Sequence, residues 1–149
     1  VQLLPIQEWF FNQNFSNHNH WNKSFLIKVP ELDTNVLHNA IHGLIENHDS
    51  FHLRYSFNKS KGIFKQFYKK DTTAIPFEIL NLDRLPKNED GKYCSKSLDE
   101  ILTSWQSDFD IITGPIYRFA YIHGYDDGSA RIYMACHHLL IDSYSWRII

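Results

Sequence analysis

Fold and chemistry depend most on residues 137–146, which read His137-His138-Leu139-Leu140-Ile141-Asp142-Ser143-Tyr144-Ser145-Trp146. Two adjacent histidines follow an apolar run that is typical of a strand. An aspartate stands four residues after the second histidine, where a helix can begin. Histidine takes up and returns protons near neutral pH, because its unperturbed pKa is about 6.5. This segment is therefore the place in the sequence that suggests a reaction.

Neighbouring side chains of a strand point to opposite faces, so the two histidines are expected to point apart. His138 then shares a face with Cys136, and His137 shares the other face with Tyr133. One imidazole would have a structural role in the fold, and the other would face a substrate. Asp142 can cap a helix, pair with a buried cation or orient an imidazole. A hydrogen-bonded pair of core histidines beside a helix cap explains the same residues, and the local sequence does not decide between these readings.

Outward from this segment, apolar periodicity predicts an α+β fold, an α/β sandwich with a mixed sheet flanked by helices. Asp33 is the expected N-cap of the clearest helix. Charged and turn-forming residues over 81–93 predict a surface connection. Helices are predicted over 5–14, after Asp33 and over 95–108, and strands over 25–29, 51–57, 63–68, 77–80, 116–123 and 130–136.

Composition narrows the class of protein. The 149 residues include 15 basic and 17 acidic side chains, a net charge of −2, and no basic stripe that would predict nucleic-acid binding. No apolar stretch approaches the 18 residues of a membrane span. Cys94 and Cys136 lack metal-binding or redox spacing, and the nine histidines show no metal signature. We expect no metal site, no membrane or nucleic-acid partner, and a reducing, cytoplasmic setting.

The motif His137-His138-x-x-x-Asp142 resembles the HHxxxDG signature of the condensation superfamily of nonribosomal peptide synthetases. The resemblance continues in order along most of the chain, and within the superfamily the epimerization branch fits best. In that branch Ser precedes Trp after the motif, as Ser145 precedes Trp146 here. The further matching segments are Leu4-Pro5-Ile6-Gln7 with Trp9-Phe10-Phe11, His20-Trp21-Asn22-Lys23-Ser24, residues 47–55, residues 108–110, residues 114–118 and residues 145–149.

Two residues depart from the pattern. Ser143 replaces the glycine that follows the motif aspartate, and His52 replaces an arginine that the family pairs with that aspartate. Asp142 is then expected to pair with Arg54, with Arg118 or with a backbone donor. The alternative is a weakened site.

The resemblance implies a fold of two lobes, each like chloramphenicol acetyltransferase, that face each other across a tunnel. Residues 1–149 would form the N-terminal lobe, truncated after the motif, with the C-terminal lobe absent. The substrate would be an aminoacyl or peptidyl thioester on the phosphopantetheine arm of a peptidyl carrier protein. The lobe itself would bind no cofactor, and alone it should not turn over.

Within this resemblance His138 matches the catalytic position and would move the α-proton of the thioester. His137 would support the geometry, Asp142 would hold the loop, and Ser145 and Trp146 would line or buttress the site. A glutamate of the second lobe would be the partner acid or base.

Other interpretations stay open. In a condensation domain the second histidine would position or deprotonate the attacking amine. In a noncatalytic module the fold would recruit a carrier protein or another enzyme, a reading that rests on the two departures. Asn22 and Lys23 are expected near the tunnel, whereas Trp9, Phe10 and Trp21 are expected to pack in the core.

Overall fold

The chain alternates helices and strands, as the periodicity predicts. A computed structural model describes residues 2–13, 15–69, 75–142 and 145. Its elements are α1 (Pro5–Asn12), β1 (Asn22–Val29), α2 (Thr34–Asn47), η1 (Asp49–His52), β2 (Leu53–Asn58), β3 (Ile63–Tyr68), β4 (Phe77–Asn81), η2 (Leu82–Arg84), α3 (Ser95–Ser107), β5 (Tyr117–His123) and β6 (Ala130–His137).

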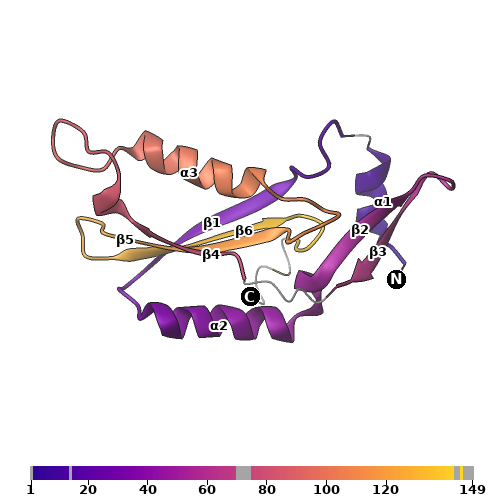
Figure 1. Ribbon diagram of the computed structural model, residues 1–149, viewed down its shortest axis with the longest axis horizontal. Coiled ribbons are helices and arrows are strands. Elements are labelled where there is room, and N and C mark those ends of the chain that lie inside the picture. Colours follow the sequence, from indigo (N-terminus) through magenta and orange to yellow (C-terminus); the bar gives the residue numbers. More distant parts are fainter. Residues whose placement is uncertain (1, 14, 70–74, 143–144, 146–149) are drawn as a thin grey trace.

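The central layer is a four-stranded mixed sheet with the strand order β1-β6-β5-β4. Strands β4 and β5 run parallel, whereas β6 is antiparallel to both of its neighbours. Helix α3 covers one face of the sheet and α2 the other, and the β2–β3 hairpin stands beside α1 at one end (Figure 1). The predicted mixed sheet between helices is confirmed.

Strand β6 lies between two hydrophobic clusters because its side chains alternate between the faces of the sheet. Met134 and Cys136 pack with aromatic residues of α1 and aliphatic residues of α2. Tyr133 and Ala135 pack with the α3 side of the sheet. The Cys136 thiol is fully buried, as its place in an apolar run predicts, and burial raises its pKa. The end of β6 is thus held on both faces.

Several element boundaries differ from the predicted ones. Phe51 and His52 belong to the 3-10 turn η1, so the strand predicted from residue 51 begins at residue 53. Strand β1 begins three residues before the predicted start, because it pairs with β6 from the rung Asn22–His137 onward. The connection over 81–93 is not wholly at the surface, since Leu82 is buried in the α3 cluster.

The predicted N-cap at Asp33 is confirmed. The Asp33 carboxylate accepts hydrogen bonds from the backbone N–H groups of Asn35 and Val36, which makes it the N-cap of α2. Across the part of the chain that the structure describes, no helix is both long and apolar enough to cross a membrane.

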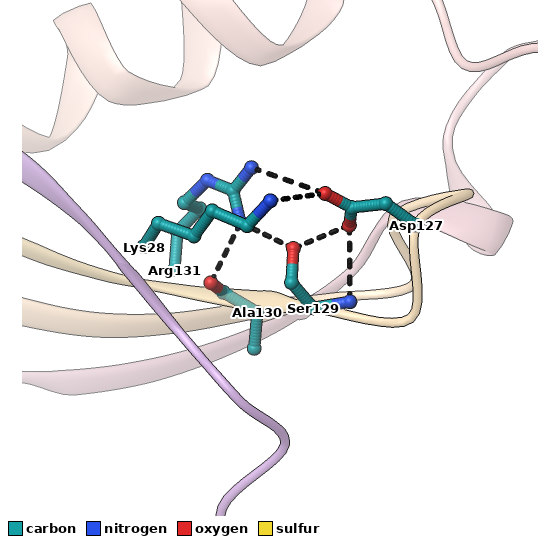
Figure 2. Close-up of polar contacts among 5 residues, drawn as sticks. All are labelled: Lys28, Asp127, Ser129, Ala130 and Arg131. Atoms are coloured by element: carbon teal, nitrogen blue, oxygen red, sulfur yellow. Dashed lines mark hydrogen bonds and ion pairs between the residues drawn. The ribbon is translucent and has the colours of Figure 1, made fainter.

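Ionic contacts tie the start of β6 to β1 (Figure 2). Lys28 of β1 lies 2.6 Å from the Asp127 carboxylate, which also accepts a hydrogen bond from the Ser129 backbone N–H at 3.0 Å. Arg131 donates to the Ser129 hydroxyl and the Ala130 carbonyl. The Lys28 ammonium and the Ser129 groups hold the pKa of Asp127 well below its usual range. This network closes the β5–β6 turn and fastens it to the edge strand.

Candidate active site

Strand β6 ends at His137, and the chain then turns back over residues 138–140. We call residues 137–140 the histidine turn. The Leu140 N–H donates to the His137 carbonyl at 2.9 Å, which closes the turn. The His138 N–H donates to the Trp21 carbonyl at 2.7 Å, just before β1 begins. The turn is therefore fastened to the start of the edge strand.

The His137 ring is fully buried, and both of its nitrogens are engaged. Its Nδ1 accepts a hydrogen bond from the Leu139 N–H at 3.1 Å, so Nδ1 carries no proton. The proton must then sit on Nε2, which donates to the His18 carbonyl at 2.9 Å. The pKa of His137 is lowered to about 4, mainly by burial; the hydrogen bond to the His18 carbonyl opposes this shift, and the charges of the neighbouring histidines add to it. A neutral ring with both nitrogens occupied suits a framework role.

The His138 ring lies on an aromatic support. It stacks on Trp21 with ring centroids 4.1 Å apart and an interplanar angle of 21°. Trp21 in turn stacks on the buried Phe10 at 4.8 Å, and Phe10 meets the edge of His137 at 5.6 Å. Both imidazoles therefore contact one aromatic group, because the strand ends at His137 and its alternation does not continue to His138. Trp21 packs against the core as expected and also supports the second histidine.

The two imidazoles differ in their hydrogen bonding. Nδ1 of His138 is buried and has no hydrogen-bond partner among the described residues. No such bond fixes a tautomer through Nδ1, in contrast to the ring of His137. The described residues therefore hold the His137 ring through both of its nitrogens, and they make no hydrogen bond to Nδ1 of His138.

Asp142 is exposed, and its Oδ1 accepts hydrogen bonds from the Ser145 N–H and hydroxyl, both at 2.7 Å. An aspartate that accepts from the backbone N–H three residues on is typical of a helix N-cap. A backbone donor was one of the three partners expected for Asp142. Ser143, which departs from the family pattern, and Trp146, whose role the resemblance implies, lie outside the described residues.

Both candidate arginines make contacts with described residues. The fully buried Arg54 guanidinium donates to the backbone carbonyls of Leu53, Phe51 and Thr113. Arg118 donates to the Glu78 carboxylate at 3.2 Å.

His52 stands where the family has its arginine. Its ring is buried, and neither ring nitrogen has a hydrogen-bond partner among the described residues. His52 therefore does not reproduce the brace to the motif aspartate in this part of the chain.

Asn22 opens β1 directly opposite His137, and Lys23 lies opposite Cys136. The Asn22 side-chain amide donates to the Gln106 carbonyl of α3 at 2.7 Å, so it joins the edge strand to the helix above. Both residues lie beside the end of β6, and their place near a tunnel stays a prediction.

Sequence reasoning did not assign three side chains that approach the turn: Trp21, Gln7 and Tyr55. Gln7 and Tyr55 both reach the carbonyl of Leu139 from elements far away in the sequence. Trp21 and Gln7 lie in segments that carry the family resemblance, which was the available signal. Tyr55 closes the matching segment 47–55, but its contact with Leu139 depends on how the hairpin packs against the end of β6, which no local pattern shows.

Comparisons with known proteins identify the family. The model of the Condensation domain family matches residues 1–149. The chain belongs to the Condensation domain family. The resemblance seen in the histidine motif is thereby confirmed for the whole length of the chain.

Curated relatives of this condensation-family chain are synthetases longer than the chain itself. It is 39% identical over 147 residues to N-(5-amino-5-carboxypentanoyl)-L-cysteinyl-D-valine synthase of Amycolatopsis lactamdurans, covering 99% of the chain and 4% of that protein. It is 30% identical over 159 residues to gramicidin S synthase 1 of Brevibacillus brevis, covering 100% of the chain and 13% of that protein. The chain thus spans a small part of the relatives that it matches.

Solved structures place the chain within the superfamily. It superimposes on the epimerization domain from the third module of tyrocidine synthetase B with a TM-score of 0.83 and 28% identity, covering 99% of this chain and 32% of that one. The starter condensation domain of rhizomide synthetase gives a TM-score of 0.74 at 16% identity, covering 99% of this chain and 34% of that one, and shows the fold alone. The predicted chloramphenicol-acetyltransferase-like fold of the epimerization branch is confirmed.

Proposed function

We propose that this chain forms part of an epimerization domain, which inverts the α-carbon of an aminoacyl or peptidyl thioester. A peptidyl carrier protein would present the thioester on its phosphopantetheine arm. The observation that carries the proposal is the half-buried imidazole of His138 on Trp21, next to a histidine whose two nitrogens are both occupied.

The α-proton of a thioester is acidic, because the electron pair left by its removal delocalises into the carbonyl. His138 would accept that proton and become an imidazolium supported by the face of Trp21, where an aromatic quadrupole favours a cation. A proton is then delivered to the opposite face of the planar carbanion, which inverts the centre. The donor on that face would be a glutamate in the other lobe, since this chain spans 32% of the similar epimerization domain.

The remaining site residues would hold the geometry. His137 would tie the turn to the segment before β1, and Asp142 with Ser145 would shape the chain after the turn. Trp146 would line or buttress the site.

Two observations favour epimerization over peptide-bond formation. The solved structure that matches with a TM-score of 0.83 is an epimerization domain, and its identity of 28% exceeds that of the starter condensation domain. In addition, the synthase that is 39% identical is named for a product that contains D-valine. The order of Ser145 and Trp146 agrees with the same branch.

The test measures exchange of the α-hydrogen with solvent deuterium in the synthetase domain that contains this chain, with its carrier protein loaded. Replacing His138 with Ala should slow exchange by at least about 100-fold, which is the usual contribution of a general base. The control is His42→Ala, since His42 lies exposed on α2 in a contact with Glu46. Full exchange in the His138→Ala variant would contradict the proposal.

Condensation is the second candidate, because the matching family model is that of the Condensation domain. In that case His138 would position or deprotonate the amine that attacks a donor thioester. Peptide-bond formation without α-exchange in the wild-type domain would favour this function. Binding of the loaded carrier with neither reaction would instead favour a noncatalytic recruiting module.

A further inference from the structure

We propose that Gln7 and Tyr55 are positioning residues for His138, because together they hold the carbonyl of Leu139 and so fix the histidine turn. This inference rests on the proposed role of His138 as the proton-transferring group. Neither side chain touches the His138 ring in the contacts described above, so each would act through the backbone.

The orientation of Gln7 follows from the start of α1. Pro5 stands at the first helical position, where its missing N–H costs no hydrogen bond. The Gln7 Oε1 accepts the backbone N–H of Leu4 at 2.8 Å, as in a capping box. With Oε1 engaged, Nε2 donates to the Tyr55 hydroxyl at 2.9 Å and lies 3.4 Å from the Leu139 carbonyl oxygen. The helix cap thus aims the amide at the turn.

Tyr55 reaches the same carbonyl from β2. Its ring is fully buried, and its hydroxyl donates to the Leu139 carbonyl oxygen at 3.1 Å. Burial raises the pKa of Tyr55, so the hydroxyl keeps its proton and remains a donor. The backbone N–H of Tyr55 donates to the Ile111 carbonyl at 2.8 Å, which anchors this part of the hairpin to the segment before β5.

These contacts complete the restraint of the backbone around His138. The His138 N–H is held by Trp21, and the Leu139 N–H is held by Nδ1 of His137. The Leu139 carbonyl is held by Tyr55 and Gln7. The peptide groups from His137 to Leu140 are therefore restrained by Trp21, which precedes β1, and by residues of α1, β2 and β6. Because a displacement of about 1 Å can cost 100-fold in rate, this restraint bears directly on catalysis.

The chain offers a matched control in Tyr133. Its hydroxyl also donates to a backbone carbonyl at 3.1 Å, that of Leu102, and its ring is buried. This second bond lies on the α3 side of the sheet and does not involve the histidine turn. Tyr55→Phe and Tyr133→Phe thus remove the same kind of hydrogen bond from two places, so a general loss of stability should affect both variants alike.

The experiment compares these two variants in the synthetase domain with its loaded carrier. Tyr55→Phe should slow α-hydrogen exchange about tenfold or more with unchanged affinity for the carrier, whereas Tyr133→Phe should leave the rate within about twofold. Gln7→Met should slow exchange as Tyr55→Phe does. In the double variant, the rate of exchange should fall by a smaller factor than the product of the factors found for the two single variants, since both side chains act on one carbonyl.

A second readout does not depend on activity. In the domain labelled with ¹⁵N histidine, Tyr55→Phe should move the ring resonances of His138 and Tyr133→Phe should not. Equal effects of the two variants on exchange and on these resonances would overturn the inference. If the wild-type domain shows no α-exchange, the proposed function fails, while the resonances still decide whether Gln7 and Tyr55 position the ring.

Discussion

The two ends of β6 are fastened to β1 by different physical means. At its start, charged side chains join the strands (Figure 2). The Lys28 and Asp127 side chains there are 63% and 46% exposed. At its end, neutral hydrogen bonds and stacked rings join the same strands, and His137 is fully buried. Exposed ion pairs are screened by water and salt, whereas buried hydrogen bonds are costly to leave unmade.

The difference shows at which end of β6 the backbone is held more tightly. The ionic end can exchange its contacts with water at little cost, so it closes a turn without fixing it tightly. The neutral end fixes each peptide group of the histidine turn and yet leaves Nδ1 of His138 without a partner among the described residues. The variants below are ordered by the size of the effect that this contrast predicts.

The largest effect is expected for His137→Leu. The change leaves the buried Leu139 N–H and the partly buried His18 carbonyl without their partner. Each such loss costs about 1–3 kcal/mol, so the free energy of unfolding should fall by about 2–6 kcal/mol. Denaturant unfolding of the domain measures it, with the exposed His42→Leu as control. Equal stabilities of the two variants would break the contrast between the two ends.

Because His137 is neutral in the folded protein, the free energy of unfolding should change by about 3 kcal/mol with pH. Its pKa is about 4 in the folded protein and about 6.5 when unfolded, and each unit corresponds to 1.36 kcal/mol. Between these values the unfolded chain binds more protons, so stability is full above pH 6.5 and falls as the pH drops toward 4. NMR of ¹⁵N-labelled histidines should show this ring neutral, with its proton on Nε2, at pH 5. Titration near 6.5 would contradict the prediction.

A smaller effect is expected for Trp21, whose ring supports His138. Trp21→Leu removes the stacked surface and should slow α-exchange about two- to tenfold, since an aromatic pair contributes about 0.5–1.5 kcal/mol. Trp21→Phe keeps an aromatic face and should recover most of the rate. If the leucine variant exchanges as fast as the wild type, the stack has no part in the reaction.

The smallest effect is expected at the ionic end of β6. Lys28→Ala removes the contact with Asp127 and should lower Tm by no more than about 2 °C, and by less in 1 M salt. Because the lowered pKa of Asp127 stabilises the fold only where its carboxyl is ionised, the difference from the wild type should vanish in acid. α-Exchange should not change. A large loss in Tm would show that this end is held as tightly as the other.

Much of the fold could be predicted because its signals are local. The Asp33 cap and the apolar stripe of α2 are readable within a few residues, and the bounds of β3 match the prediction. The start of β1 could not be read locally, since Asn22, Lys23 and Ser24 have low strand propensity and are extended because β6 pairs with them.

The histidine motif was visible as a chemical pattern, but its supporting residues were not. The bond from Tyr55 to Leu139 joins residues 84 apart, and the contact from Gln7 spans 132. No local pattern encodes such contacts, which arise only when α1, the hairpin and the end of β6 pack together. The position of His137 on a strand predicted a framework role for one histidine, and its hydrogen bonds supply the physical reason.

The pairing of β1 with β6 makes the site sensitive to the length of both strands. The two strands pair over eight consecutive residues, from Asn22–His137 to Val29–Ala130, and Trp21 stands directly before the first of these pairs. Deleting one residue from either strand would move the indole along β6 by about 3.3 Å and turn alternate side chains to the wrong face. Sequence change in these strands should therefore proceed by substitution, while insertions collect in the β5–β6 turn at the other end of the sheet.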